Sequence, residues 1–198
     1  MKRVIIASNN AHKVDEIRNA LAFPGWEFFT LREAGIESDP VEDGDGFEAN
    51  ARIKAQAARE AAGGDCAVLA DDSGLEVDAL GGAPGVYSSR YAGVDGDDEA
   101  NNAKLFAELA DVPDNQRTAR FVCTLVFIDE DGSEKVARGT VEGRIGHELR
   151  GQNGFGYDPL FLPDEFGGGI TFAEVPQSEK SAISHRGNAL RLLREMLQ

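Results

Sequence analysis

The stretch 67–76, AVLADDSGLE, constrains the fold more than any other part of this 198-residue chain. Its first four residues are apolar, as in a buried β-strand. Two carboxylates, a hydroxyl and a glycine follow, a set that is typical of turns. Because ligand sites in open α/β sheets gather where strands end, we expect the strand to end there and to present Asp71 and Asp72 to a ligand. Adjacent carboxylates repel, so the pair indicates a bound cation or a shared proton, and an acidic turn is the alternative interpretation.

Strand-like and helix-like segments alternate along the rest of the chain, and the length suits one domain. Apolar residues with a period near 3.6 predict helices, and short apolar or alternating runs predict strands. The expected strands are residues 4–7, 26–30, 67–70, 75–80, 120–129 and 134–145, the last two joined as a hairpin through 130–133. The expected helices are one that follows the polar turn 8–13 and carries Val14, Ile17 and Leu21 on one face, then 47–62, 97–110 and 178–197.

The composition restricts the partners. A formal net charge of −15 argues against sequence-independent binding of DNA or RNA, which requires a basic surface. A small phosphorylated ligand is compatible with this charge, because a few lysines and a metal ion can neutralise phosphate locally. Two cysteines make no disulfide framework, the apolar run in residues 1–8 is too short for a signal peptide, and no stretch is long enough to span a membrane. We therefore expect a cytoplasmic protein without nucleic-acid or membrane partners.

Polar residues at two helix starts are candidates for binding phosphate. The segment 8–13, SNNAHK, can cap the first helix, and the free amide groups of a helix start bind anions. Lys13 is badly placed for the helix dipole and well placed for a phosphate. Asn50 and Lys54 lie four residues apart, hence on one helix face, after the acidic loop 37–46. Helix capping and plain solvent-exposed surface are the alternative interpretations.

Two later segments are candidates for contacting the rest of a ligand. Residues 151–159 hold three glycines, which allow close backbone approach, and Phe155 and Tyr157 offer aromatic faces to a flat ring such as a nucleobase. Lys180, His185 and Arg186 lie within seven residues and suit an anion or a carbonyl. A tight turn and a structural histidine are the alternatives. No Cys/His spacing suits zinc, and no G-x-S-x-G motif supports a nucleophilic serine.

Six motifs in order resemble one family. They are SNNxxK after the first strand, FEANAxxKA on the second helix, ADDSGL, GGAPGVYSSRYAG, GFGYDP and EKSAISHRGxAL. Together they resemble the inosine/xanthosine triphosphate pyrophosphatases, which remove deaminated purines from nucleotide pools. The resemblance runs from residue 4 to residue 197.

The resemblance implies an elongated, two-lobed α/β fold with a central mixed β-sheet flanked by helices, and an active site in the cleft between the lobes. It implies a single pyrophosphatase domain over residues 1–198, a homodimer, and hydrolysis of ITP, dITP or XTP to the monophosphate and pyrophosphate. Mg²⁺ is the implied cofactor, and hard oxygen ligands also suit Mn²⁺. Asp72 would be the general base, and Glu42, Asp71 and Asp72 would hold the metal. The substrate-binding residues would be Ser8, Asn9, Asn10, Ala11, His12, Lys13, Asn50, Lys54, Ser73, Arg90, Phe155, Gly156, Tyr157, Asp158, Lys180, His185 and Arg186.

The chain departs from the family pattern at two places. Asn9 and His12 stand where the first loop usually has glycines, so side chains can replace backbone contacts to phosphate there. Ala49 stands where the second helix usually carries a glutamate, which gives Glu42 more weight. Two other readings stay open: a Maf-type nucleotide pyrophosphatase, whose usual first loop Ser-Pro-Arg-Arg is absent, and a nucleotide sensor without catalysis. A sensor does not need the general base that Asp72 offers.

Overall fold

The computed structural model describes residues 1–8 and 10–198, without the side chains of Ala11 and His12. Asn9 and those two side chains, which we expected to contact phosphate, therefore lie outside the described residues. The main elements in chain order are β1 (Lys2–Ile6), α1 (Ala11–Ala20), β2 (Trp26–Thr30), α2 (Phe47–Ala61), β3 (Ala67–Val77), α3 (Asp98–Glu108), β4 (Thr118–Ile128), β5 (Glu134–Ile145), β6 (Phe161–Pro163), α4 (Gln177–Ile183) and α5 (His185–Leu197).

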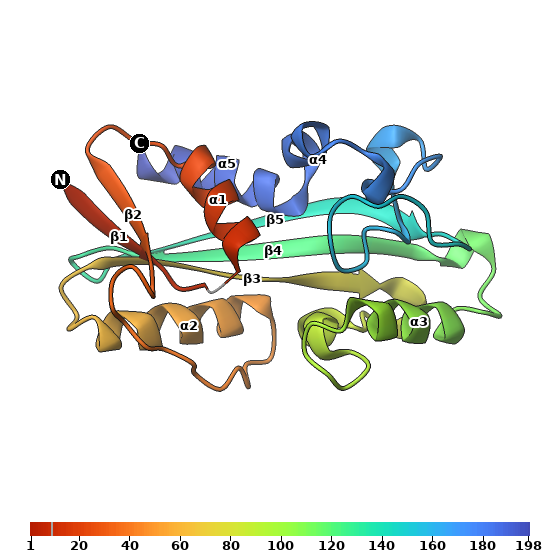
Figure 1. The fold of residues 1–198 in the computed structure, drawn as a ribbon, viewed down its shortest axis with the longest axis horizontal. Helices are drawn as coiled ribbons and strands as arrows, with labels where there is room; N and C mark the ends of the chain where they lie inside the picture. The colour runs from red at the N-terminus through yellow and green to blue at the C-terminus, as the bar shows by residue number, and fades with distance from the viewer. Residues whose placement is uncertain (9) are drawn as a thin grey trace. The chain divides into compact units, whose positions relative to one another are not determined.

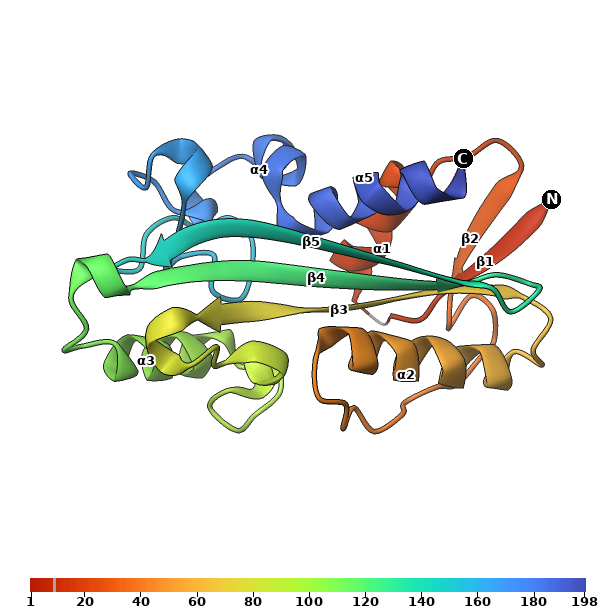
Figure 2. The same ribbon diagram turned by 180° about the vertical axis from the view of Figure 1, so that it is seen from behind.

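The strands form one mixed sheet in the order β2-β1-β3-β4-β5-β6. β1 pairs in parallel with β2 and with β3, whereas β6 pairs antiparallel with β5 (Figures 1 and 2). The predicted mixed α/β class and the predicted hairpin of β4 and β5 are confirmed. β6 was not predicted, because three residues are too few to show a period.

The chain divides into two compact units, each assembled from separate segments. Unit 1 comprises residues 1–72, 123–139 and 186–198, and unit 2 comprises 73–122 and 140–185. β3, β4 and β5 each contribute residues to both units. In the described part of the chain, no helix has the length and apolar character needed to cross a membrane.

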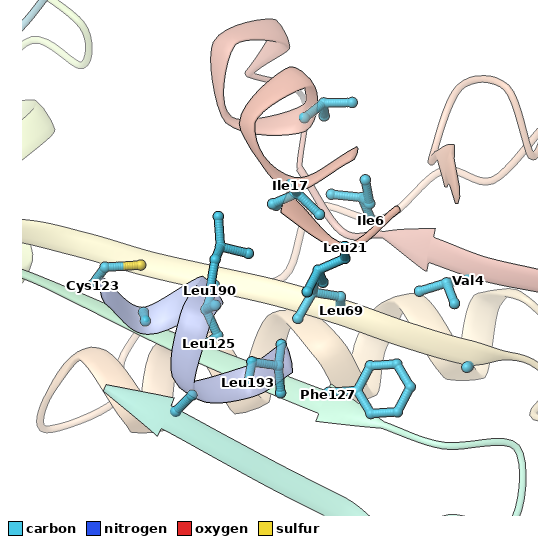
Figure 3. Packing of buried hydrophobic residues seen from close by; sticks show 14 residues of the cluster. Val4, Ile6, Ile17, Leu21, Leu69, Cys123, Leu125, Phe127, Leu190 and Leu193 are labelled. Atoms are coloured by element: carbon cyan, nitrogen blue, oxygen red, sulfur yellow. The ribbon is translucent and has the colours of Figure 1, made fainter. Parts of the chain in front are cut away.

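The sheet of unit 1 buries apolar side chains on both faces. Because side chains alternate along a strand, Val4 and Ile6 belong to one cluster while Ile5 belongs to another. The first cluster holds apolar residues of α1 and α5, including Ile17 and Leu193 (Figure 3). The second is closed by a stripe of buried alanines on α2, Ala51, Ala55 and Ala58. Unit 1 is thus a sheet covered by α1 and α5 on one face and by α2 on the other.

Unit 2 has its own core of apolar and aromatic side chains. Phe121 lies 4.7 Å from Phe161 between ring centroids, and Leu105 of α3 packs in the same cluster. We expected Phe106 on the apolar face of the helix at 97–110, together with Ala100, Ala103, Leu105 and Leu109, and this was wrong for Phe106, which is 42% exposed, whereas the polar residues Asn101 and Asn102 are buried. Those two amides satisfy backbone groups of neighbouring loops, which a sequence period cannot reveal.

The long helix expected over residues 178–197 is two helices. Ser184 has extended backbone angles (φ −63°, ψ 154°) between α4 and α5, so the chain changes direction there. Serine is a favoured helix N-cap because its hydroxyl can accept a bond from a free amide of the first turn, and this preference competes with helix continuation.

The packing of α5 gives a test of the unit 1 core. Leu193 is fully buried in the first cluster, while its neighbour Leu192 is 42% exposed. Leu193→Ala is expected to lower the free energy of unfolding by about 2–5 kcal/mol, because it leaves a cavity and removes buried apolar area. Leu192→Ala makes the same chemical change on the same helix and is expected to cost less than about 0.5 kcal/mol. Urea unfolding of both variants measures this, and equal losses would contradict the packing described here.

Candidate functional site

The pleat of β3 sends the two adjacent carboxylates to opposite faces of the sheet. Asp71 follows Leu69 by two residues and shares the face that α1 and α5 cover; Asp72 follows Ala70 and shares the face that α2 covers. The expectation that the strand ends at this pair was wrong, since β3 continues to Val77. Local turn preference loses to the sheet because β3 has a neighbouring strand on each side and each carboxylate has cations on its own face.

Asp71 is buried and held by two cations. Its Oδ1 accepts a hydrogen bond from Lys13 Nζ at 2.8 Å, and its Oδ2 accepts one from Arg186 Nε at 3.2 Å. The Cys123 thiol lies 3.8 Å from the same Oδ2. Burial alone raises the pKa of Asp71, but the charges of Lys13 and Arg186 outweigh it and hold the pKa well below its usual range. Asp71 is therefore ionised over the whole physiological range.

Arg186 connects Asp71 to the first helix. Its Nη1 donates to Glu16 Oε2 at 2.9 Å, and the residue is 2% exposed. Burial works against the charge, yet the carboxylates of Asp71 and Glu16 raise the pKa of Arg186 above its usual value. Sequence grouped Arg186 with Lys180 and His185; the structure gives its guanidinium two carboxylate partners in unit 1. Glu16 was missed, because a glutamate on an amphipathic helix gives no signal of its own.

Asp72 has one oxygen engaged and one open. Its Oδ1 accepts from Lys54 Nζ at 2.8 Å, and the same ammonium reaches Glu42 Oε2 at 3.2 Å. Asp72 Oδ2 is buried and has no hydrogen-bond partner among the residues described. Burial raises the pKa of Asp72, and Asp71 and Glu42 raise it further, against the opposing charge of Lys54. Two neighbouring aspartates thus have pKa values pushed in opposite directions.

The loop that carries Glu42 is fastened to the start of α2. Asn50 Oδ1 accepts a bond from the Gly44 amide at 2.9 Å, and Asn50 is fully buried. A Cβ on Gly44 would lie 2.6 Å from the Ala49 Cβ, so only glycine allows this approach. Asn50 Nδ2 is a second buried atom with no partner within the described chain. An open donor and the open acceptor of Asp72 both belong to the side of the sheet that α2 covers.

The three predicted metal ligands do not form one cluster. Within the described part of the chain there is no group of three His, Cys, Asp or Glu side chains arranged to hold a metal ion. Glu42 and Asp72 share one ammonium, whereas both oxygens of Asp71 are taken by Lys13 and Arg186. Mg²⁺ needs only one or two carboxylates when substrate phosphates and water complete its shell. Glu42, with the Asp72 carboxylate close to it around the shared Lys54 ammonium, fits that requirement.

The second glycine-rich loop forms a cluster of its own in unit 2. Asp158 accepts from the Phe155 amide at 2.9 Å and pairs with Lys180, both charged residues being buried. Lys180 Nζ lies 5.1 Å from the centre of the Phe155 ring, which is itself 40% exposed. A Cβ on Gly154 would lie 2.0 Å from Asp158 Oδ2, so the loop requires glycine there. Phe155 is the aromatic face of this loop that solvent reaches.

Tyr157 and His185 are packed into the same unit. Tyr157 is 3% exposed, and its hydroxyl donates to the Ser88 carbonyl at 2.8 Å, so its ring belongs to the core. Burial raises the pKa of Tyr157 above its usual value. The His185 ring stacks on Phe121 with 5.0 Å between centroids and 16° between planes.

The remaining predicted substrate-binding residues are Ser8, Asn10, Ser73 and Arg90. Ser8 Oγ accepts from the Asn10 amide at 3.2 Å, and Asn10 in turn caps α1 through the Lys13 amide at 3.2 Å. Ser73 is half-buried in β3, and the Arg90 guanidinium lies 5.3 Å from the Tyr87 ring centre in the 3₁₀ segment η2 (Gly85–Arg90).

Comparison with known proteins decides which family these motifs represent. A family model for the Ham1 family matches residues 4–196. The chain belongs to the Ham1 family. This confirms the resemblance stated from the motifs, and the match covers nearly every residue of both units.

Individual Ham1 relatives agree over their full lengths. A Clostridium perfringens protein named dITP/XTP pyrophosphatase is 49% identical over 202 residues, covering 100% of this chain and 98% of its own. The solved Ham1 structure from Coxiella burnetii has a TM-score of 0.90 at 39% identity, covering 100% of this chain and 98% of that one. A Mycobacterium abscessus structure described as nucleoside-triphosphatase / dITP/XTP pyrophosphatase has a TM-score of 0.82 at 43% identity, covering 99% and 100%.

The buried charges of this Ham1 chain predict how stability responds to pH. The folded pKa of Asp71 lies below its unfolded value of about 3.9, so its contribution is complete above that value and is lost as pH falls toward the folded pKa. Asp71→Asn is expected to lower the free energy of unfolding by about 3 kcal/mol at pH 7, because the buried cations beside it lose the charge of this carboxylate. In urea unfolding, this loss should stay constant from pH 7 to about pH 4 and shrink below about pH 4.

Asp72→Asn is the matched control for that experiment. The folded pKa of Asp72 is raised, so the ionised carboxylate does not stabilise the fold above that pKa. This variant is expected to be as stable as the wild type or more so at pH 7, with the wild type gaining relative to it as pH falls. Parallel pH profiles for the two variants would contradict the opposite pKa shifts.

Proposed function

We propose that this chain hydrolyses deaminated purine nucleoside triphosphates, ITP, dITP and XTP, to the nucleoside monophosphate and pyrophosphate. The observation that carries the proposal is the pair Asp71 and Asp72. They are adjacent in β3, and their pKa values are shifted in opposite directions. Two neighbouring carboxylates with opposite shifts divide the roles of fixed anion and proton acceptor. Full-length relatives named dITP/XTP pyrophosphatase support the substrate class.

Asp72 is the group assigned to move a proton. Water attacks the α-phosphorus, its oxygen forms the new P–O bond, and its proton passes to the open Asp72 Oδ2. The bond from the α-phosphorus to the bridging oxygen breaks, and pyrophosphate leaves. A raised pKa makes Asp72 a better acceptor than an ordinary aspartate, and the charge of Lys54 opposes that rise.

The phosphate end of the substrate is assigned to the cations and donors of unit 1. Lys54 and Lys13 supply positive charge, and the buried Asn50 Nδ2 supplies a neutral donor without another partner in the described chain. The two lysines are already fixed by carboxylates, so they need little reorganisation to stabilise charge on the departing pyrophosphate. The start of α1, capped by Asn10, adds backbone amides.

The purine base is assigned to the loop around Phe155. Its exposed ring offers a stacking face, and Lys180 and His185 are candidate donors to the O6 carbonyl of hypoxanthine or xanthine. Adenine carries an amino group at that position, which would face donors. A mismatch of this kind in a buried site gives discrimination on the order of 10⁴. The role of Arg186 in base choice stays a prediction, because its guanidinium pairs with Asp71 and Glu16.

Magnesium is the proposed cofactor, held by Glu42 and Asp72 through hard carboxylate oxygens. When bound, Mg²⁺ supplies positive charge that neutralises the phosphates and the charge developing on the leaving group. We further propose that the protein is a homodimer, as the family resemblance implies, and that it works in the cytoplasm, as its low cysteine content favours.

The first test is turnover of ITP, dITP and XTP against ATP and GTP, with release of pyrophosphate as the readout. With Mg²⁺ present, kcat/KM for ITP is expected to exceed that for ATP by at least about 10². Mn²⁺ should replace Mg²⁺, and excess EDTA should abolish activity. Full activity in EDTA would refute the metal, and ITP binding without turnover would favour the nucleotide sensor.

Asp72→Asn tests the proton acceptor, because it keeps the shape of the side chain and removes the charge. It is expected to lower kcat for ITP by about 10² or more while ITP affinity is largely retained. In the wild type, kcat should fall on the acid side of a pKa above the ordinary aspartate range, and this limb should vanish in the variant. Asp78→Asn, which alters a partly exposed carboxylate paired with Arg120, is the control and should keep normal kcat. Near wild-type turnover by folded Asp72→Asn protein would refute the assignment.

A further inference from the structure

Two side chains of helix α3 form hydrogen bonds with the backbone amide and the backbone carbonyl of one glycine in the second glycine-rich loop. Asp98 Oδ2 accepts from the Gly156 amide at 2.7 Å, and Asn102 Nδ2 donates to the Gly156 carbonyl at 2.8 Å. Asp98 and Asn102 lie four residues apart, so both side chains share one face of the helix. We call these two residues with their glycine the α3 clamp.

The clamp fixes the peptide groups on both sides of Gly156. A backbone amide and carbonyl held from one helix leave the residue little freedom, and its φ of +61° lies in the left-handed region that favours glycine. Phe155 and Tyr157 are attached directly to those two peptide groups. The direction in which the exposed Phe155 ring projects therefore depends on α3 as well as on the Asp158–Lys180 pair.

The Asn102 side-chain amide donates a hydrogen bond to the loop, while its own carbonyl oxygen has no partner in the described chain. Its Nδ2 donates to the Gly156 carbonyl and to the Asp98 carbonyl at 2.7 Å, so both of its hydrogens are used. Its Oδ1 is buried and has no partner in the part of the chain that is described. The residue is 4% exposed. Keeping a buried amide half-satisfied is unfavourable unless the contact that it makes has another use.

We propose that Asp98 and Asn102 are positioning residues that hold Phe155 in the orientation in which it stacks on the purine base. The inference rests on the proposed function, since it assigns the base to this loop. The two residues act through Gly156 and do not touch the substrate. Loss of the clamp should therefore weaken nucleotide binding and leave the proton-transfer chemistry at Asp72 unchanged.

The experiment compares Asn102→Asp and Asp98→Ala with two controls. Asn102→Asp keeps the shape but loses both donors, and Asp98→Ala removes the acceptor. Each is expected to raise KM for ITP about tenfold with kcat within about twofold, as expected for lost binding in ground and transition states alike. Amide exchange at Gly156, followed by NMR, should speed up about tenfold or more in both.

The controls separate positioning from general destabilisation. Asp98→Asn keeps a carbonyl oxygen as acceptor and should restore normal KM and slow exchange. Leu105→Ala, on the same helix and fully buried, should lower the melting temperature while KM and Gly156 exchange stay normal. An unchanged KM in Asn102→Asp, or an equal rise in Leu105→Ala, would overturn the clamp. Absence of ITP turnover in the wild type would instead refute the proposed function, and the substrate role of the clamp with it, while the exchange rates would still decide whether the clamp holds the loop.

Discussion

The alternation of side chains along β3 is the constraint on which the site depends. Because the side chains of successive residues in a strand point to opposite faces, two adjacent aspartates lie in two different environments. Asp71 meets Lys13 and Arg186 on the side of α1 and α5, while Asp72 meets Lys54 on the side of α2. Had the chain turned at this point, both carboxylates would share one solvent-exposed setting. The sheet itself therefore creates the division between an anion locked in its charged form and an anion with a raised pKa.

Burying so many charges is unfavourable unless each one is paired, and the paired charges of unit 1 follow that rule closely. Arg186 is held by Asp71 and Glu16, and Lys54 by Asp72 and Glu42. In a chain with a net charge of −15, these basic residues are concentrated where carboxylates already lie. Asp72 Oδ2 and Asn50 Nδ2 are among the buried atoms that have no partner in the described chain, and both belong to the side that α2 covers. A polyanionic ligand with a bound cation would supply partners for polar atoms that have none and that lie beside fixed cations.

In unit 2, polar contacts hold a glycine-rich loop in one conformation. Glycines permit the close approaches seen at Gly154 but supply no side chains to fix the backbone. The fixing groups come instead from other elements: Lys180 through Asp158, and Asp98 and Asn102 through Gly156. The exposed Phe155 ring is thus carried by a loop whose order derives from buried polar contacts, and an ordered aromatic face binds a planar ligand at smaller entropic cost than a mobile one.

The sequence by itself determined the α/β class, most element positions and the family, because buried periodicity and ordered motifs are local properties of the chain. From residue type and spacing it also predicted Lys13, Lys54 and Asp71 as site residues, and the structure pairs Lys13 with Asp71 and Lys54 with Asp72. Only the tertiary structure decided that β3 runs through the aspartates, that Arg186 pairs with Glu16, and that Asn102 faces a loop 54 residues away. These are contacts between distant segments, where strand pairing and charge neutralisation override the turn and helix preferences that a local pattern records.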